Sequence, residues 1–243
     1  ELMVGRDIDL SPRRSRGVPK ETLLSLSNVG LTKDGVERIS QVSFDVRAGE
    51  IVGVAGVSGN GQRELAEIVA GLISPTSGEV AINGERVNGV GTRNVRKAGL
   101  AYVPEDRLGT GLAPSLSIVD NLVLTRDRGF LVDRKSAHAE AEAFIKQLEI
   151  KTPNALTATR KLSGGNSQKV LLAREIFAAG TNSRVLVVCS PTRGLDVGAV
   201  EAVHKLLDEA RSDGKAILLI SEDLDEVLTL ADKILVLYRG SVV

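Results

Sequence analysis

Ile51-Val-Gly-Val-Ala-Gly-Val-Ser-Gly-Asn-Gly-Gln-Arg-Glu-Leu65 is the most informative stretch of this chain. Its first five residues are mostly apolar and are typical of a short buried strand. Glycines follow at positions 56, 59 and 61, and apolar residues then recur with helical spacing up to Leu72. A strand, a glycine loop and a helix in this order predict a turn in which backbone N–H groups and a helix N-terminus face an anion.

Strand and helix patterns alternate on both sides of this turn. Alternating apolar residues predict antiparallel strands between Leu23 and Val46. Residues 105–162 carry helical patterns without clear strands, which predicts a separate helical lobe. The whole pattern predicts an α/β fold with a mostly parallel sheet. Further strands are expected at Gly78–Ile82, Gly99–Val103, Val185–Val188, Ala216–Ile220 and Ile234–Tyr238, and helices at Glu64–Leu72, Ser136–Leu148, Ser167–Ala178 and Val200–Ser212.

The composition narrows the class of protein. A 42% hydrophobic content over 243 residues is enough to bury a core. Lys and Arg number 31 and Asp and Glu number 31, so the net charge is zero, and no overall field favours nucleic acid. The one cysteine, Cys189, cannot form an internal disulfide or a zinc cluster, which suits a reducing cytosol. The longest apolar runs are far too short to span a bilayer.

The end of the glycine loop departs from the usual phosphate-binding pattern. That pattern has lysine at position 62, to reach the terminal phosphates, and serine or threonine at position 63, to ligate magnesium. Gln62 brings no charge, and Arg63 offers only donors and cannot ligate a metal. Phosphate binding without magnesium-assisted cleavage and a glycine-rich turn without a ligand both remain open. The candidate binding residues are Gly56, Ser58, Gly59, Asn60, Gly61, Gln62 and Arg63.

Two further strings resemble motifs of one family. Leu162-Ser-Gly-Gly-Asn-Ser-Gln-Lys169 leads into a predicted helix, and Pro191-Thr-Arg-Gly-Leu-Asp-Val-Gly198 follows a predicted buried strand. They resemble the signature motif and the D-loop of ABC ATPases, in the order that family shows after its glycine loop. The resemblance runs from about Leu23 to Val243. It implies an ABC ATPase cassette with a P-loop nucleotide-binding core, an N-terminal antiparallel β subdomain and a helical subdomain.

The resemblance also implies domain bounds and a role for the signature. Residues 1–21 are expected to be an inter-cassette linker, 22–104 and 167–243 the core with its β subdomain, and 105–166 the helical subdomain with the signature. Ser163 and the glycines after it precede a helix and present a hydroxyl and N–H groups to an anion. In the family that anion is a partner cassette's nucleotide, although a plain serine-glycine helix cap remains an alternative. The residues concerned are Leu162, Ser163, Gly164, Gly165, Asn166 and Gln168 of the signature, and Gly194, Leu195 and Asp196 of the D-loop.

Several positions depart from an active ATPase of that family. The strand before Pro191 ordinarily ends in aspartate, for magnesium, and glutamate, to position the attacking water, but here it ends in Cys189 and Ser190. Cysteine is a poor ligand for a hard cation, and serine lacks a carboxylate. Glu222 stands where a histidine is usual, and Glu105 aligns with the glutamine that senses the γ-phosphate. No intact catalytic residue and no metal ligand are therefore expected at this chain's own site.

The motifs together resemble the second, C-terminal cassette of fused two-cassette ATPases of sugar and nucleoside importers. Gly59-Asn-Gly-Gln62 and Pro104-Glu-Asp-Arg107 favour the nucleoside branch, which works with basic membrane lipoproteins. The resemblance implies ATP and Mg²⁺ as cofactors of a composite site. It also implies four partners: the N-terminal cassette of the same polypeptide, two integral-membrane permease subunits and, indirectly, an extracytoplasmic solute-binding lipoprotein. The implied location is the cytoplasmic face of the cell membrane, peripherally attached.

Two other functions remain open. A regulatory or scaffold nucleotide-binding domain that never hydrolyses ATP fits the departures from the active pattern. A stand-alone homodimeric ABC ATPase predicts hydrolysis by this chain alone, whereas the degenerate-cassette hypothesis predicts weak or no activity from the isolated domain. A soluble ABC ATPase acting on DNA or ribosomes is disfavoured by the zero net charge.

Overall fold

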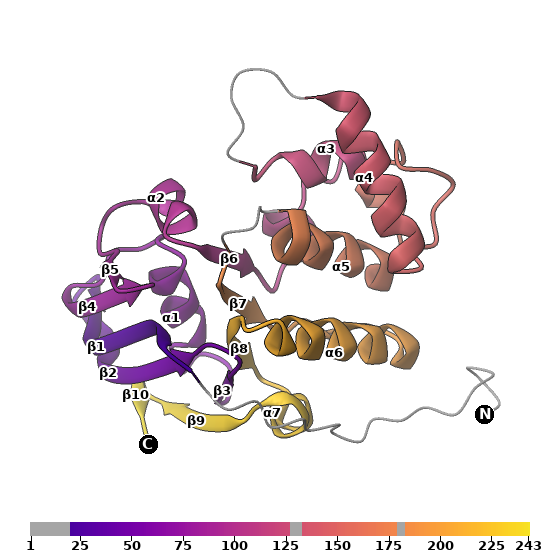
Figure 1. Cartoon of the computed structure of the whole chain (residues 1–243). Coiled ribbons are helices and arrows are strands. Elements are labelled where there is room, and N and C mark those ends of the chain that lie inside the picture. The colour runs from indigo at the N-terminus through magenta and orange to yellow at the C-terminus, as the bar shows by residue number, and fades with distance from the viewer. Residues whose placement is uncertain (1–19, 127–132, 179–182) are drawn as a thin grey trace. The chain divides into compact units, whose positions relative to one another are not determined.

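The computed structural model describes residues 20–126, 133–178 and 183–243 (Figure 1). The predicted linker therefore lies outside the described residues, apart from Lys20 and Glu21. The described chain forms two compact units. We call residues 20–102, 183–190 and 208–243 the sheet unit, and residues 103–178 and 191–207 the helical unit. The finer division at residues 105 and 166 stays a prediction.

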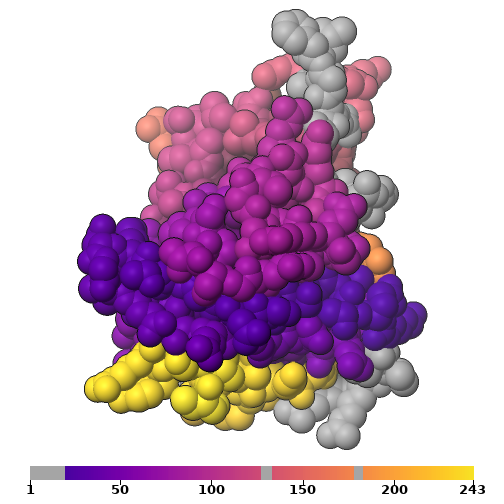
Figure 2. Space-filling view, turned by 90° about the vertical axis from the view of Figure 1, so that its left-hand side faces the viewer, coloured from indigo at the N-terminus to yellow at the C-terminus, as the bar shows by residue number. Residues whose placement is uncertain are grey.

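The sheet unit contains an antiparallel sheet, as predicted for Leu23 to Val46. Its strand order is β2-β1-β4-β5, and every neighbouring pair is antiparallel. The turn between β1 and β2 uses Asp34 and Gly35, both at positive φ, which Asp and Gly tolerate best. Figure 2 shows the N-terminal residues of this sheet, in indigo, along one face, with the yellow C-terminal segment beside them. The strands are β1 (Thr22–Lys33), β2 (Val36–Arg47), β4 (Ser77–Ile82) and β5 (Glu85–Arg86).

A second sheet carries the order β10-β9-β3-β8-β7-β6. Strand β3 pairs in parallel with β8 and β9, and β7 pairs in parallel with β8. Strands β3, β7 and β8 are buried along their whole length, as expected for parallel strands covered on both faces. The predicted mostly parallel sheet is confirmed. The strands are β3 (Ile51–Ala55), β6 (Leu100–Val103), β7 (Val185–Cys189), β8 (Ala216–Ser221), β9 (Lys233–Tyr238) and β10 (Ser241–Val242).

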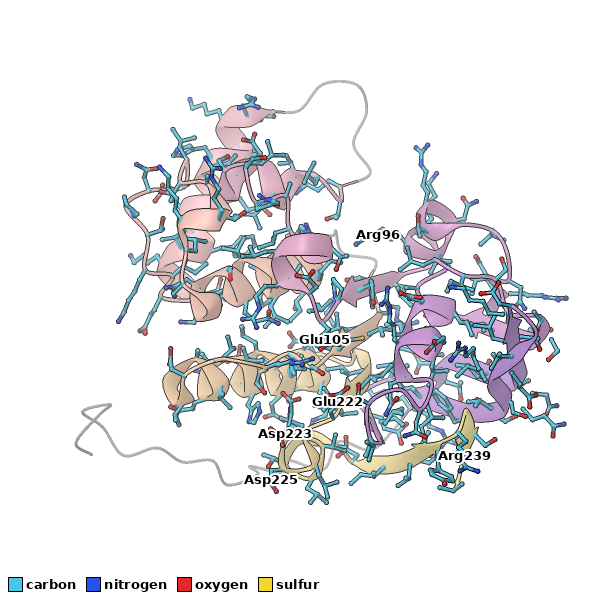
Figure 3. All side chains as sticks on the ribbon, turned by 180° about the vertical axis from the view of Figure 1, so that it is seen from behind. Arg96, Glu105, Glu222, Asp223, Asp225 and Arg239 are labelled. Atoms are coloured by element: carbon cyan, nitrogen blue, oxygen red, sulfur yellow. The ribbon has the colours of Figure 1, made fainter. Side chains whose placement is uncertain are left out.

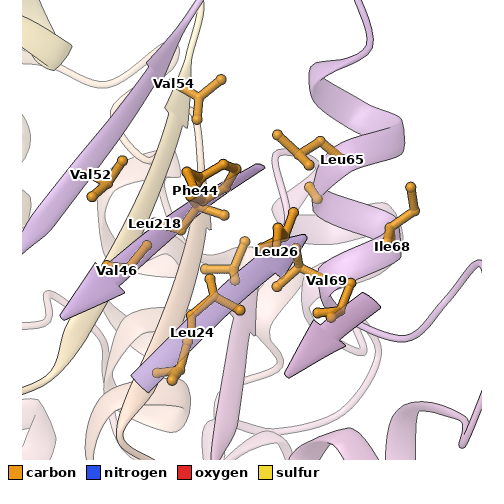
Figure 4. Packing of buried hydrophobic residues seen from close by; sticks show 14 of the residues in the cluster. Leu24, Leu26, Phe44, Val46, Val52, Val54, Leu65, Ile68, Val69 and Leu218 are labelled. Atoms are coloured by element: carbon orange, nitrogen blue, oxygen red, sulfur yellow. The ribbon is translucent and has the colours of Figure 1, made fainter. Parts of the chain in front are cut away.

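One apolar cluster holds the sheet unit together. It joins both sheets to helix α1 (Gln62–Val69), which buries Leu65, Ile68 and Val69 (Figure 4). Burying one such side chain contributes roughly 1.5–3 kcal/mol relative to leaving it exposed. Helix α1 ends earlier than the predicted Leu72, because Gly71 takes a positive φ of 70° that no helix continues. Strand β3 and the packed helix α1 together fix the two ends of the glycine loop.

The helical unit is organised around the buried amide of Asn121. Its Oδ1 accepts the N–H of Ala113 at 2.8 Å, and its Nδ2 donates to the carbonyls of Ala113 and Ser117, both at 3.0 Å. No named strand lies between residues 105 and 162 among the described residues, as the pattern predicted. The elements are η1 (Arg107–Gly111, a π-helical turn), α3 (Ile118–Val123), α4 (Arg134–Gln147), η2 (Thr159–Lys161), α5 (Gly164–Ala173) and η3 (Arg174–Ala178).

Helix α5 differs from its predicted bounds at both ends. It begins at Gly164 rather than Ser167, because Ser163 is the N-cap and its side chain accepts the N–H of Asn166. It ends at Ala173, where the backbone changes to the π-helical turn η3. The remaining helices are α2 (Thr92–Lys97), α6 (Val197–Ser212) and α7 (Leu224–Leu230). Among the described residues, no helix is long and apolar enough to cross a membrane.

Candidate nucleotide site and signature

The glycine loop follows β3 and leads into α1, as predicted. Gly59 and Gly61 adopt φ values of 86° and 107°, which side-chain-bearing residues rarely reach. A Cβ at Gly61 would lie 2.8 Å from the carbonyl oxygen of Arg38, so only glycine fits there without a shift. The structure therefore gives these two positions backbone conformations that favour glycine.

Gln62 turns back onto this loop. Its Nε2 donates to the carbonyl of Val57 at 2.9 Å, and its Oε1 accepts the N–H of Asn60 at 3.1 Å. The residue is only 8% exposed. The amide thus satisfies a carbonyl and an N–H of the loop at once, and it introduces no positive charge where a phosphate would lie.

Arg63 faces the opposite way. Its side chain is 84% exposed, and its Nε contacts Oε1 of Glu67, one helical turn later, at 2.8 Å. The guanidinium carries only donors and cannot take the place of a hydroxyl on magnesium. Arg63, the second residue of α1, is therefore engaged with the surface of its own helix.

The turn between β9 and β10 braces the loop from the other side. The N–H of Arg239 donates to Oδ1 of Asn60 at 2.8 Å, and the N–H of Gly240 donates to the Asn60 carbonyl at 2.9 Å. The Asn60 side chain also donates from Nδ2 to Val57 at 2.8 Å. Figure 3 labels Arg239 at this turn. Sequence reasoning did not assign this contact, which joins residues 179 positions apart.

Strand β7 ends at Cys189 and Ser190 follows it, at the two positions where the family pattern has acids. Cys189 is buried, as expected of a small apolar residue at a strand end. Burial raises the pKa of its thiol to about 12, and the thiol hydrogen-bonds with the hydroxyl of Tyr102. Ser190 has a positive φ of 41°, and its N–H donates to the carbonyl of Ile220 at 2.8 Å. This strand end offers a neutral thiol and a hydroxyl.

Glu222 follows strand β8 and is exposed. The next residue, Asp223, is the N-cap of α7, and its side chain accepts the N–H groups of Asp225 and Glu226 (Figure 3). Across residues 20–126, 133–178 and 183–243, no group of three or more His, Cys, Asp and Glu side chains has an arrangement suited to a metal ion.

The signature residues open helix α5 in the helical unit. Ser163 and Gly164 are exposed, whereas Gly165 and Gln168 are buried. The Nδ2 of Asn166 donates to the Ser163 hydroxyl oxygen at 2.8 Å, which orients the hydroxyl at the helix start. Leu162, the first signature residue, is the half-buried C-cap of η2. An exposed hydroxyl beside the first N–H groups of a helix suits an anion from outside the unit.

The predicted D-loop packs behind the signature. Oδ1 of Asp196 accepts the N–H of Ala199 at 2.9 Å and so caps α6. A Cβ at Gly165 would lie 2.7 Å from the Cβ of Ala199, so the glycine permits this close approach. Gly194 has a positive φ of 68°, and the N–H of Leu195 donates to the Thr192 carbonyl at 3.0 Å. The signature and the D-loop thus form one packed cluster.

Glu105 belongs to the same cluster. Its carboxylate forms an ion pair with Arg193, which lies in the segment that includes the D-loop. Arg107 donates from Nη1 to the Gly164 carbonyl at 3.2 Å and from Nη2 to the Arg193 carbonyl. Neither arginine was predicted as a site residue. Arg107 and Arg193 were inside the quoted motifs, but their contacts join segments 57 and 86 positions apart.

The predicted site residues thus fall into two groups. The glycine loop, Cys189, Ser190 and Glu222 belong to the sheet unit, and Glu105, the signature and the D-loop belong to the helical unit. The first group has a loop backbone suited to an anion but no acid suited to magnesium at the end of β7. The second group presents an exposed serine hydroxyl at a helix N-terminus.

Comparison with known proteins agrees with this geometry. A family model described as "ABC transporter" matches residues 39–193. A glucose import ATP-binding protein of Haloferax volcanii is 41% identical over 100% of this chain and 45% of its own length. A guanosine import ATP-binding protein of Bacillus subtilis is 37% identical over 100% of this chain and 48% of its own length. A ribose import ATP-binding protein of Rubrobacter xylanophilus is 41% identical, covering 99% of this chain and 48% of that protein.

The chain spans about half the length of the curated relatives it matches. Among solved structures, a bacterial ABC transporter cassette determined as a dimer has a TM-score of 0.78 at 25% identity, over 90% of this chain and 96% of that one. A nucleotide-free ATP-binding cassette from an ABC transporter also reaches 0.78 at 18% identity, over 92% and 90%, which supports the fold. The chain belongs to the ABC transporter family and has the fold of its ATP-binding cassette.

Proposed function

We propose that this chain is the degenerate cassette of an importer for nucleosides or simple sugars, and that it lends its signature to a partner cassette's ATP site. The observation that carries the proposal is a contrast within one chain. The signature presents an exposed Ser163 at the start of α5, whereas the end of β7 presents Cys189 and Ser190 in place of two acids. This contrast supports a role in which the chain contributes the signature to a composite site and has no catalytic acids at the end of β7.

The proposed class of solute is taken from the names of the relatives. Their names describe import of glucose, guanosine and ribose, and one further relative is named for nucleoside import. Small hydroxylated solutes are common to all of them. The motifs Gly59-Asn-Gly-Gln62 and Pro104-Glu-Asp-Arg107 favour the nucleoside branch, and this finer assignment is part of the proposal.

The residues present fit ATP in part. The glycines at positions 59 and 61 give the loop a backbone that suits a phosphate, but Gln62 and Arg63 supply neither the lysine charge nor the magnesium hydroxyl. At the signature, the Ser163 hydroxyl and the N–H groups of the glycines after it suit a phosphate from a partner. ATP supplies the transferable phosphoryl group, and Mg²⁺ neutralises charge on its phosphates. This chain's residues bind and orient that group at the composite site, whose other half is the partner's glycine loop.

The proposal includes the partners and the location. Import ATP-binding proteins act with permeases, so we expect two integral-membrane permease subunits and, on the outer side, a solute-binding lipoprotein. The partner cassette is expected to be the N-terminal half of the same polypeptide, which agrees with relatives about twice as long as this chain. Such an assembly places the chain at the cytoplasmic face of the cell membrane.

A Ser163→Arg variant tests the donated signature. Arginine replaces the hydroxyl and fills the space in front of α5, so ATP hydrolysis by the assembled importer is expected to fall to background. Ser136→Arg is the matched control, because Ser136 is exposed near the start of α4 in the same unit. Hydrolysis is measured as phosphate release from the purified importer. Turnover equal to that of the unmodified importer in the Ser163→Arg variant refutes the donated signature.

The non-hydrolysing scaffold makes the opposite prediction for the assembly. In that case the Ser163 variant and the Ser136 control leave the importer's turnover alike. The stand-alone homodimer predicts turnover from this chain by itself, which the missing acids at the end of β7 argue against.

A further inference from the structure

We infer that Arg107 is a positioning residue, which holds the signature at a fixed place relative to the D-loop segment (residues 191–198). The Glu105–Arg193 ion pair helps to hold that segment in place. We call these three side chains the arginine brace. The inference rests on the proposed function, because the signature so positioned acts on a partner's nucleotide. It assigns Glu105 a role other than the phosphate sensing that its place in the motif implies.

Arg107 makes two hydrogen bonds to backbone carbonyls. Its Nη1 donates to the carbonyl of Gly164 at 3.2 Å, in the first turn of α5, and its Nη2 donates to the carbonyl of Arg193. Both nitrogens belong to one planar guanidinium, whose donors have fixed relative directions. One side chain therefore sets the distance between the signature backbone and the D-loop segment.

Arg193 is held through both its main chain and its side chain. Its main-chain carbonyl accepts from Arg107, while its side chain pairs with the carboxylate of Glu105. The loop that carries both Glu105 and Arg107 is itself ordered, because Oδ1 of Asp106 accepts the N–H of Gly109 at 2.8 Å. Arg193 is thus held at two points by one short loop.

The two signature glycines lie close to their neighbours. A Cβ at Gly165 would lie 2.7 Å from the Cβ of Ala199 in α6, and a Cβ at Gly164 would lie 3.2 Å from Nη1 of Arg107. The signature glycines therefore have the brace on one side and α6 on the other. A shift of the D-loop segment moves the backbone that carries Ser163.

The exposure of the Glu105–Arg193 ion pair indicates that it positions the signature more than it stabilises the fold. The side chains of Arg193 and Glu105 are 62% and 44% exposed, and ion pairs at such exposed sites contribute little to the stability of the fold. Loss of the brace is therefore expected to leave the unit folded while the signature moves. A misplacement near 1 Å at a reacting centre lowers rate by up to about 100-fold.

An Arg107→Ala variant of the assembled importer tests the brace. We expect kcat for ATP hydrolysis to fall about 10- to 100-fold with little change in KM, because the partner's loop still binds the nucleotide. Amide hydrogen exchange over residues 163–167 is expected to accelerate, with the thermal midpoint unchanged within about 2 °C. Arg134→Ala is the matched control, since Arg134 is exposed, lies in the same unit and pairs with Asp120 at 3.0 Å.

Two further variants separate positioning from other roles. Arg107→Lys keeps the charge but not the two-point geometry, so partial recovery of kcat is expected. The exchanged pair Glu105→Arg with Arg193→Glu is expected to recover most of the kcat that either single change loses. Failure of the exchanged pair to recover it contradicts the role of the ion pair.

The remaining outcomes distinguish the inference from the proposed function. If Arg107→Ala raises KM at unchanged kcat, the residue contacts a phosphate directly and the positioning role is wrong. If Ser163→Arg abolishes turnover but Arg107→Ala alters neither kcat nor exchange, the brace is refuted and the donated signature stands. If Ser163→Arg leaves turnover unchanged, the proposed function and the catalytic effect of the brace fall together.

Discussion

The backbone N–H of Asn60 donates to Oε1 of Gln62 at 3.1 Å, so the residue in the usual lysine position is bonded to its own loop. The same amide donates to the Val57 carbonyl at 2.9 Å. A lysine there carries a full charge and no acceptor. The loop of this chain therefore has an internal partner for an N–H that faces an anion in other loops of this type.

A Gln62→Lys variant is expected to bind ATP more tightly. The new ammonium adds a charge-assisted hydrogen bond to a phosphate and frees the N–H of Asn60, which together raise affinity about 10-fold or more. Hydrolysis by the chain alone is not expected to appear, because Cys189 and Ser190 still stand at the end of β7. Titration calorimetry with ATP measures the affinity, and Gln147→Lys adds the same charge at an exposed position of α4 as the control. Equal affinity in both variants contradicts this view of Gln62.

Replacing Asn121 by alanine is expected to destabilise the chain by about 2–4 kcal/mol. The change leaves the part-buried N–H of Ala113 without the Asn121 acceptor and removes the donors to the carbonyls of Ala113 and Ser117. Urea unfolding measures the effect. Asn94→Ala is the comparison, since Asn94 is exposed and its side chain donates to the Val90 carbonyl at 2.8 Å, so less than about 1 kcal/mol is expected. Similar losses in both variants show that the Asn121 network is not the organising contact.

Cys189 is expected to make the protein less stable in alkali. Burial raises its thiol pKa from 9.0 to about 12, so the folded state keeps the proton that the unfolded state loses. The stability present below pH 9 is therefore lost as pH rises from 9 toward 12, by about 1.4 kcal/mol for each pH unit. Between pH 9 and pH 10.5 this thiol accounts for a fall of about 2 kcal/mol.

A Cys189→Ala variant tests whether this thiol lowers the stability of the protein in alkali. Its unfolding free energy is lower at pH 8 because a buried sulfur is lost, but its fall between pH 8 and pH 10.5 is smaller than in the unmodified chain. Denaturant unfolding at the two pH values gives both numbers. Parallel curves for the two proteins indicate that the thiol does not titrate in this way.

Much of the fold was predictable because local pattern and tertiary burial agree. Strands β3, β7 and β8 are mostly apolar, and the structure buries each of them along its length. Helix ends were less predictable. The start of α5 depends on the side chain of Ser163 acting as N-cap, and its end depends on a π-helical turn that no sequence period announces.

The candidate site was predictable as motifs but not as contacts. The glycine positions at 59 and 61 follow from the backbone angles that the loop needs. The return of Gln62 to Val57 depends on the loop's closed shape, and the contact of Arg239 with Asn60 depends on the pairing of distant strands. The brace at Arg107 likewise arises from segments brought together only in the folded helical unit.

ATP hydrolysis by this chain, alone and mixed with its partner cassette, tests the central claim most directly. Phosphate release is measured with and without Mg²⁺, at matched protein concentrations. The degenerate-cassette proposal predicts background release from the chain alone and magnesium-dependent turnover only in the mixture, lost again with Ser163→Arg. Robust magnesium-dependent turnover by the chain alone contradicts it, because that result makes the site of Gln62, Cys189 and Ser190 catalytic.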